Sequence, residues 1–348
     1  MNSRITSGRR ATLLDVAREA EVSRATASLV LRKSPLVGTE TRKRVEAAMA
    51  RVGYVYNLGA ARMRAARSRT VGVVIPSLSN PFFAEMLAGI EATLDEAEMG
   101  VIFANTRESL EKQKAIIRRM REHGVDGLII CPAAESGIDL LERASEWGLP
   151  LVQALRYVSA TQGDYSGIDY FGGMRGAADY LIGLGHRRIG FVSGNRVHSA
   201  YQERLEGFRT SMEAHGLPAD LILTIPLTHA EGMATAERLL EWPDPPSAAL
   251  CFNDVVALGL LRGLHDRGVE AGVGFSVVGF DNVPEGILAR PTLTSVSTRP
   301  FAVGRAAAKL LLGRLDDPAK EDGRLVEPTE LVVRQSSGAP RGTSSDRT

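Results

Sequence analysis

From Thr70 onward, short apolar runs alternate with longer amphipathic stretches. The first series reads VGVVIP, PFFAEMLAGIEATLDEA, VIFAN, SLEKQKAIIRRMREH and GLIICP. The same alternation recurs in ADYLIGLGHRRIGFVSG, AALCFNDVVALGLLRGL and FSVVGFDN. Such alternation predicts parallel strands joined by crossover helices, and two units in tandem predict a cleft between them. Because ligands of open α/β sheets bind at the carboxyl ends of strands, we expect binding residues in the loops directly after strands.

The chain up to residue 69 differs from the rest in charge. It carries 15 Lys and Arg against 5 Asp and Glu, whereas the remainder carries 27 against 36. A basic end on a nearly neutral chain favours contact with a polyanion, although a solvated basic tail would have the same composition.

This basic part contains start and stop signals for three helices. Thr12 and Asp15 have the spacing of a capping box before the first helix, and Ser23 is placed to cap a short second helix. We expect Thr39 to cap a third helix that ends at Gly53. Two short helices separated by about three residues are typical of a helix-turn-helix, although another three-helix cluster would show a similar pattern.

The second helix of a helix-turn-helix enters the major groove of DNA with its N-terminal residues. Hydroxyl side chains there contact phosphates, which position the helix without reading sequence. The hydroxyl residues are Ser23, Thr26 and Ser28. Arg24 has the chemistry to read a guanine through two hydrogen bonds, and Ala25 and Leu29 offer apolar contacts.

The runs TLLDVAREAEVSRATASLVL and VGTETRKRVEAAMARVGYVYN closely resemble the N-terminal domain of the lactose-repressor (LacI/GalR) family. The segments SNPFFAE, GHRRIGFVSG, ERLEGF, FNDVVALG, SVVGFDN and LTSVSTRP resemble the family's core in the same order. The resemblance implies an N-terminal three-helix helix-turn-helix domain plus a periplasmic-binding-protein-like core of two parallel-sheet α/β subdomains.

The resemblance also implies a domain layout. The expected parts are a disordered tail over 1–10, the helix-turn-helix domain over 11–56, a hinge helix or linker over 57–69, the effector-binding and dimerisation core over 70–338, and a disordered tail over 339–348. The expected DNA-contacting residues are Thr12, Ser23, Arg24, Ala25, Thr26, Ser28, Leu29, Asn57, Ala60, Met63 and Arg64. Of these, Arg24, Ala25 and Leu29 fall on the family's base-reading positions.

Met63 falls where the family's hinge helix pushes an apolar side chain, usually Leu, between base pairs of the minor groove. Two residues depart from the family pattern: Tyr56 stands where Pro is frequent, and Gly59 replaces a Val-like residue. Glycine inside a helix costs about 1 kcal/mol relative to Ala, so we expect a less ordered free hinge. A plain basic linker is the alternative interpretation.

The effector-binding residues that the resemblance implies are Asn80, Phe82, Arg156, Asp169, His198, Arg204, Asn253 and Asp281. Arg204 falls on the family's effector-binding arginine, whose fork of donors suits a hydroxyl pair or a carboxylate. Asn253 and Asp281 follow apolar strands, where each has the alternative role of capping a helix. Tyr170 stands where the family usually has Asn, so that part of the pocket departs from the pattern.

The function implied is a sequence-specific DNA-binding transcriptional regulator, a repressor by family default. It would bind a palindromic operator in double-stranded DNA as a homodimer, under the control of a small-molecule effector such as a sugar or related metabolite. Cleft closure would change operator affinity, and the coupling is reciprocal. The last residues show no leucine heptads, so a dimer is expected rather than a tetramer.

Other functions find less support in the sequence. It shows no Walker, GxGxxG, GxSxG or HExxH motif and no metal-ligand spacing of its histidines, so we expect no enzyme, no cofactor and no metal. Two cysteines in apolar runs, no apolar signal segment and no long apolar span predict a cytoplasmic protein without membrane contact. A transporter's sugar-binding protein would need a secretion signal and would lack residues 11–53. An enzyme with an attached DNA-binding module would need a reactive cluster in the cleft.

Overall fold

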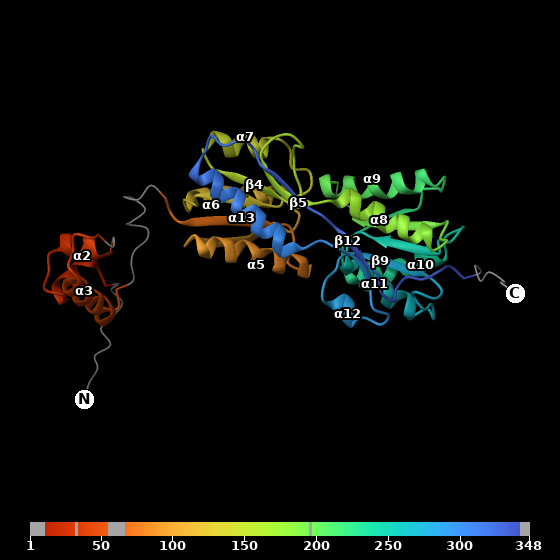
Figure 1. Ribbon diagram of the computed structural model, residues 1–348, viewed down its shortest axis with the longest axis horizontal. Helices are drawn as coiled ribbons and strands as arrows, with labels where there is room; N and C mark the ends of the chain where they lie inside the picture. The colour runs from red at the N-terminus through yellow and green to blue at the C-terminus, as the bar shows by residue number, and fades with distance from the viewer. Residues whose placement is uncertain (1–10, 32–33, 55–66, 195–196, 342–348) are drawn as a thin grey trace, which may run out of the picture. The chain divides into compact units, whose positions relative to one another are not determined.

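The structure is a computed structural model that describes residues 11–31, 34–54, 67–194 and 197–341. The chain divides into two compact units, Met1–Ser68 and Arg69–Thr348 (Figure 1). Within the described ranges, no helix has the length and apolar character needed to cross a membrane.

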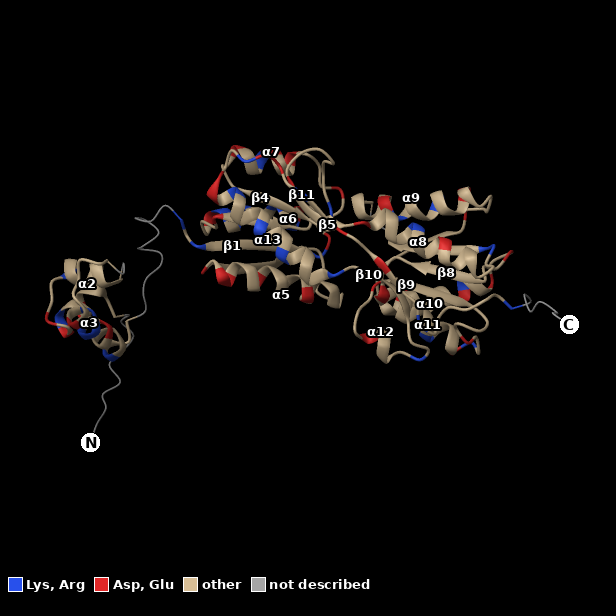
Figure 2. Ribbon diagram, viewed as in Figure 1, with Lys and Arg blue, Asp and Glu red and all other residues tan. Residues whose placement is uncertain are grey.

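The first unit packs three helices around a small core. These are α1 (Leu13–Glu19), α2 (Arg24–Leu31) and α3 (Thr39–Val52). The buried side chains are Val16, Ala17, Ala20, Ala27, Val30, Val45 and Ala48. Most of these are alanine or valine, so the short helices approach closely. Figure 2 shows basic residues along α3, namely Arg42, Lys43, Arg44 and Arg51.

The predicted caps of α1 and α2 are confirmed. The Asp15 amide donates to Thr12 Oγ1 at 3.4 Å, and the Thr12 amide donates to Asp15 Oδ2 at 2.8 Å. Ser23 Oγ accepts from the Thr26 amide at 3.0 Å. Each bond satisfies a backbone N–H that the first helical turn leaves without a partner. The predicted break between α1 and α2 is therefore fixed by local hydrogen bonds.

The predicted start of α3 is wrong by one residue. Thr39 is the first helical residue, and the N-cap is Gly38, which has no side chain to offer. Helix boundaries commonly shift by this amount because the end turns are held by few hydrogen bonds. The end at Gly53 is confirmed: its φ of 64° is in the left-handed region, which glycine adopts without strain.

The second unit consists of two lobes, each built on a six-stranded sheet. The first lobe has the strand order β11-β5-β4-β3-β1-β2, and its strands are parallel. Its strands are β1 (Thr70–Ile75), β2 (Gly100–Asn105), β3 (Gly127–Ile130), β4 (Leu151–Ala154), β5 (Asp164–Ile168) and β11 (Arg324–Glu327). Its helices are α5 (Pro81–Glu96), α6 (Leu110–Glu122), α7 (Asp139–Glu146) and α13 (Pro300–Asp316).

The second lobe repeats this plan with the order β12-β10-β9-β8-β6-β7. Its strands are β6 (Ile189–Gly194), β7 (Ile222–Ile225), β8 (Ala248–Cys251), β9 (Ser276–Asp281), β10 (Thr294–Ser297) and β12 (Glu330–Val332). Its helices are α8 (Tyr170–Gly183), α9 (Ser199–Ala214), α10 (His229–Leu240), α11 (Asp254–His265) and α12 (Glu285–Leu288). Only β12 among these described strands runs antiparallel to its neighbour, β10.

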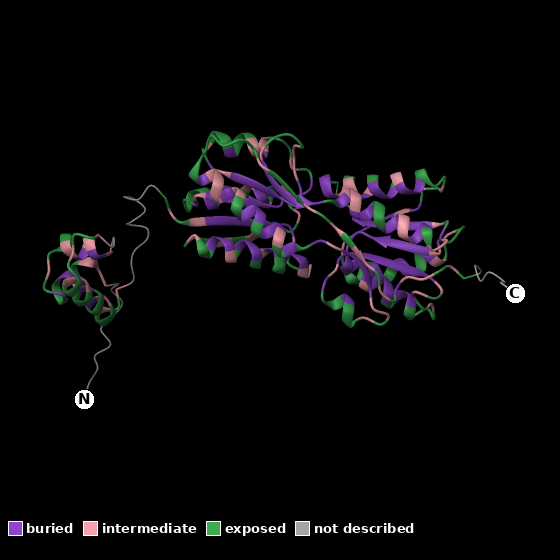
Figure 3. Ribbon diagram, in the orientation of Figure 1, coloured by how far each residue is buried: buried purple, intermediate pink, exposed green. Residues whose placement is uncertain are grey.

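Both faces of each sheet are covered. In β1, Val73 and Ile75 enter one apolar core, while Val74 between them enters another. Figure 3 accordingly shows the central strands as buried and the outer faces of the helices as exposed. Burial on both faces explains why the strands read as continuous apolar runs rather than as alternating ones.

The two lobes are not simple tandem units, as the sequence pattern had suggested. The chain passes between them after β5, after β10 and after β11. As a result α13 packs on α5, and Figure 1 shows this late helix among elements from the first half of the core. The cleft is therefore bounded by three connections, and its two sides come from interleaved parts of the sequence.

Candidate functional site

A cavity of about 760 Å³ lies between the two lobes of the second unit. Its walls are loops that follow β1 to β4 in the first lobe and β6 to β9 in the second. These are the carboxyl ends of the strands, where the sequence pattern places a binding site. The volume is in the range of small-molecule sites. Seven of the residues expected at an effector site line the cavity: Asn80, Phe82, Arg156, His198, Arg204, Asn253 and Asp281.

Arg204, on α9, is a buried cation surrounded by aromatic rings. It is 4% exposed, and its guanidinium carbon lies 4.0, 4.2 and 4.3 Å from the ring centres of Tyr170, Phe252 and Phe280. Nη1 donates to the Ala200 carbonyl at 3.0 Å, while the buried Nε has no hydrogen-bond partner. No carboxylate of the described residues forms an ion pair with it. The ring faces therefore take the place of a counter-ion.

Asp281 is the last residue of β9, in the second lobe, and lines the cavity. Its Oδ2 accepts from Asn80 Nδ2 at 2.8 Å, which links the second lobe to the first. Burial raises the pKa of Asp281 to about 6, against the opposing effects of Arg204 and the Asn80 hydrogen bond. Near neutral pH Asp281 is therefore a carboxylate acceptor that is protonated below about pH 6.

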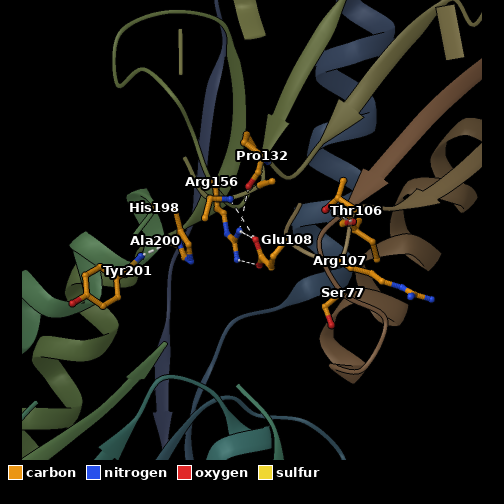
Figure 4. Close-up of polar contacts among 12 residues, drawn as sticks. Ser77, Thr106, Arg107, Glu108, Pro132, Arg156, His198, Ala200 and Tyr201 are labelled. Atoms are coloured by element: carbon orange, nitrogen blue, oxygen red, sulfur yellow. Dashed lines mark hydrogen bonds and ion pairs between the residues drawn. The ribbon is translucent and has the colours of Figure 1, made fainter. Parts of the chain in front are cut away.

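Arg156, after β4, forms a two-pronged ion pair with Glu108. Its Nη1 and Nη2 donate to the two Glu108 oxygens at 2.9 and 2.8 Å, and Nη1 also donates to the Pro132 carbonyl at 3.2 Å (Figure 4). Arg156 is 8% exposed. Glu108 compensates the charge of this buried guanidinium. Burial by itself lowers the pKa of Arg156, but Cys131 and Glu108 together outweigh it and raise that pKa. The pair forms a fixed polar wall of the cavity.

His198 precedes α9 and is the N-cap of that helix. Its Nδ1 accepts from the Tyr201 amide at 3.2 Å, so the ring proton resides on Nε2. Burial, with the charges of Arg156 and Arg204, lowers the pKa of His198 to about 2. Figure 4 shows the imidazole near the Arg156–Glu108 pair. His198 is thus a neutral ring with one N–H donor left for the cavity.

Asn253 and Phe82 line the cavity and also stabilise the structure around it. Asn253 is the N-cap of α11 and accepts from the Val256 amide at 3.1 Å, which is the capping role that the sequence left open. Its side chain nevertheless lines the cavity. Phe82 does so too, and it packs edge-on against Phe83 with ring centres 5.6 Å apart.

Asp169 is the one expected effector residue that the structure places outside the cavity lining. It is exposed, and its side chain caps α8 by accepting from the Gly172 amide at 2.8 Å. A helix N-terminus favours an acidic cap, which accounts for the residue type at this position. The prediction that Asp169 contributes to the cavity is therefore corrected.

Several lining residues were not anticipated. Arg107 and Glu108 follow β2, and Phe252 follows β8, so the rule that binding residues come directly after strands would have found them. Tyr170 was noted only as a departure from the family pattern, yet its ring covers Arg204. No sequence signal indicated that contact.

Four non-glycine lining residues have a backbone in the left-handed region. Their φ values are 53° for Arg107, 59° for Glu108, 65° for Leu155 and 114° for Asp281. Such conformations cost of order 1–3 kcal/mol each and persist where the surroundings hold them, commonly at binding sites. Their concentration around one cavity supports a functional role for it.

The expected DNA-contacting residues of the first unit lie at the start of α2 and beside it. Ser23, Arg24 and Ala25 are exposed, and Thr26, Ser28 and Leu29 are half-buried. Thr12, at the start of α1, is half-buried as well. The inward side of α2 is taken by Ala27 and Val30. The exposed first turn can therefore meet DNA without disturbing the core. Asn57, Ala60, Met63 and Arg64 lie outside the described residues.

Comparison with known proteins identifies the class. Residues 12–57 match the family described as bacterial regulatory proteins, lacI family, and residues 178–337 match a periplasmic binding protein-like domain. The chain is 32% identical over 331 residues to catabolite control protein A of Priestia megaterium, covering 94% of this chain and 99% of that protein. The chain therefore belongs to the LacI family of bacterial transcriptional regulators and is not an enzyme.

Other relatives agree with this assignment. The repressor PurR of Photobacterium profundum is 31% identical over 339 residues, with 94% of this chain and 98% of that protein covered. A structure of the lac repressor dimer bound to operator and the anti-inducer ONPF has a TM-score of 0.87 at 26% identity, covering 95% of this chain and all of that chain. A CelR–cellobiose complex has a TM-score of 0.72 at 32% identity, covering 94% of this chain and 100% of that chain.

Among the described residues, no group of His, Cys, Asp or Glu side chains has an arrangement that could hold a metal ion.

Proposed function

We propose that this regulator represses transcription from a palindromic operator, which it binds as a homodimer, and that a small molecule in the cavity between the lobes controls operator affinity. The observation that carries the proposal is the convergence of seven expected effector residues on one cavity. Relatives support the two ligands: one solved structure is a lac repressor dimer with operator, and another is a regulator with cellobiose. A protein with these ligands works in the bacterial cytoplasm.

The domain layout follows from the same proposal. Residues 11–56 read the major groove, 57–69 form the hinge, and 70–338 bind the effector and dimerise. Arg24, Ala25 and Leu29 contact bases, while Ser23, Thr26 and Ser28 contact phosphates. Met63 serves as the minor-groove wedge, with Asn57, Ala60 and Arg64 beside it. Thr12 contacts the backbone from the start of α1.

Dimerisation through the first lobe is consistent with its open sheet edge. β2 is the edge strand, and none of its residues is fully buried; Phe103 is 39% exposed. Apolar side chains on an edge strand are unfavourable in water and are usually covered. A second copy of the chain would cover them.

The experiment that tests the function is selection of random DNA by the purified protein, followed by a salt titration on the selected site. A palindromic site with a stoichiometry of two chains per duplex and a steep salt dependence supports the proposal. Selection without sequence preference, repeated in the presence of candidate metabolites, would contradict it.

A further inference from the structure

The side chains that line the cavity are not balanced in charge. Three arginines and two carboxylates face it: Arg107, Arg156, Arg204, Glu108 and Asp281. Arg156 and Glu108 neutralise each other through their two-pronged pair. What remains is the buried Arg204 and the solvent-exposed Arg107 against Asp281, which already accepts from Asn80. The lining therefore has a formal excess of one positive charge, part of which solvent screens at Arg107.

The excess charge is concentrated at Arg204. Asp281 and Glu203 are the acids that act electrostatically on it, yet neither forms an ion pair with its guanidinium. Nη1 is used by the Ala200 carbonyl, and Nη2 has no hydrogen bond to any residue that the structure describes. The three rings cover the guanidinium but supply no acceptor in its plane. A buried cation with unused donors is costly unless a ligand completes it.

A second donor faces the same cavity. His198 uses Nδ1 to cap α9, so its Nε2–H is the polar group that remains for a ligand. Asp281 and Asn253 supply hydrogen-bonding groups on the second lobe, and the Phe82 and Phe252 rings supply apolar surface. The cavity thus combines donors for an anion with polar groups for hydroxyls.

We propose that the effector is a polyhydroxylated anion whose acidic group binds Arg204 and His198, with its hydroxyl groups on Asp281 and Asn253. The single excess charge favours a monoanion, that is, a sugar acid with one carboxylate. A phosphate ester carries about −1.5 to −2 at pH 7 and would overcompensate. This inference rests on the proposed effector function of the cavity and specifies its ligand class.

The proposal fixes the sign of a pH effect. An added negative charge raises the pKa of titratable groups nearby, here Asp281 and His198. These groups face Arg107, Arg156 and Arg204, and Asp281 also faces Asp254. The hydroxyl contacts to Asp281 are common to an acid and its neutral counterpart, and both weaken when Asp281 is protonated below about pH 6. The anion alone also gains from losing the Asp281 charge, so the preference for the acid, measured as the ratio of the two affinities, rises as pH falls from 8 to 5.5.

The test is isothermal titration of the full chain with matched pairs: galacturonate against galactose, and gluconate and glucose 6-phosphate against glucose. We expect at least one acid to bind at least tenfold more tightly than its neutral counterpart, and this preference to increase at lower pH. Carboxylate and phosphate arms distinguish the two sources of the anion. A neutral sugar that binds as tightly as its acid, or a panel in which no acid binds, would overturn the proposal. Selection of an operator by the same preparation does not depend on this result. Failure of the sugar-acid proposal can therefore be distinguished from failure of the proposed regulator function.

Variants locate the acidic group. Arg204→Met keeps an apolar stem among the rings and should lower affinity for the acid at least a hundredfold. His198→Asn retains a capping side chain for α9 but removes the Nε2 donor. It should therefore lower the affinity for the acid and leave the affinity for the neutral sugar unchanged. Arg188→Met is the matched control, because Arg188 pairs with Asp220 and Asp244 away from the cavity. Equal loss for acid and neutral sugar in His198→Asn would contradict the assignment.

Discussion

Asn80 and Asp281 are separated by 201 positions in the chain, and a 2.8 Å hydrogen bond joins them between the two lobes. The orientation of the Asn80 amide is fixed, because its Oδ1 accepts from the Phe82 amide at 3.0 Å. Its NH₂ group must therefore face Asp281. A ligand that hydrogen-bonds to Asp281 competes with the Asn80–Asp281 hydrogen bond, which joins the two lobes. Ligand binding in the cavity is therefore coupled to the contact between the lobes.

The raised pKa of Asp281 predicts a pH dependence of stability. The folded pKa of about 6 lies above the ordinary aspartate pKa of 3.8, so the native state binds this proton more strongly. The free energy of unfolding should rise by about 1 kcal/mol between pH 7.5 and pH 5 from this group. Asp281→Asn should remove that increment, as measured by urea unfolding at both pH values. Burial, with the nearby Asp281 charge, also raises the pKa of Asp254 to about 8; removing that charge lowers the pKa of Asp254, which adds to the expected difference between the two proteins. The same pH slope in both would contradict the prediction.

Breaking the Arg156–Glu108 pair should destabilise the first lobe. Glu108→Gln leaves a buried guanidinium without a full counter-charge and should cost about 2 kcal/mol, less than for a fully buried pair because Glu108 is partly exposed. Adding Arg156→Met should recover part of this loss, since the uncompensated charge is gone. Urea unfolding of both single variants and the double variant measures the coupling. Strictly additive losses would show that the pair contributes nothing.

The roles assigned on α2 predict different effects on operator binding. Arg24→Ala should change which base is preferred at one operator position, with about 1–3 kcal/mol of discrimination lost. Ser23→Ala should weaken all sites alike, because Ser23 caps α2 and its proposed contact is to phosphate. Gel-shift titration over a series of single-base operator variants measures both. Ser109→Ala removes a comparable cap from α6 in the core and serves as the control. Uniform losses for Arg24→Ala would contradict base reading.

The contact between α5 and α13 depends on a glycine. A Cβ at Gly304 would come within 2.0 Å of the Met86 carbonyl oxygen, whereas one at Gly176 on α8 would meet nothing within 4 Å. Gly304→Ala should therefore cost about 1–3 kcal/mol through overpacking, while Gly176→Ala should stabilise by about 0.5–1 kcal/mol. Thermal unfolding of both variants checks this. A neutral Gly304→Ala would mean that α13 moves away without loss.

Much of the fold and of the candidate sites could be predicted, because the sequence patterns that indicate them extend over only a few residues. The caps at Thr12 and Ser23 bond to amides three residues onward, and patterns of that range are visible in the sequence. The apolar runs mark strands, and strand ends mark loops. This reasoning, with the family resemblance, located Arg204, Asn253 and Asp281.

The same signals misplaced Asp169. It too follows an apolar strand, β5, but that strand lies next to β11 near the edge of its sheet, and the carboxylate turns to cap α8. Position after a strand indicates the correct end of a sheet. It does not indicate which loops face the opposite lobe.

The sequence by itself determined the three helices of the first unit with the caps of α1 and α2, the two-sheet α/β class and the loops that carry the binding residues, because hydrogen bonds over a few residues and apolar periodicity encode them. The tertiary structure alone decided that α13 and β11 return to the first lobe, that Asn80 meets Asp281, and that Tyr170, Phe252 and Phe280 enclose Arg204. These contacts join residues tens to hundreds of positions apart. They are selected by close packing and by compensation of buried charge, which exist only once the lobes are assembled.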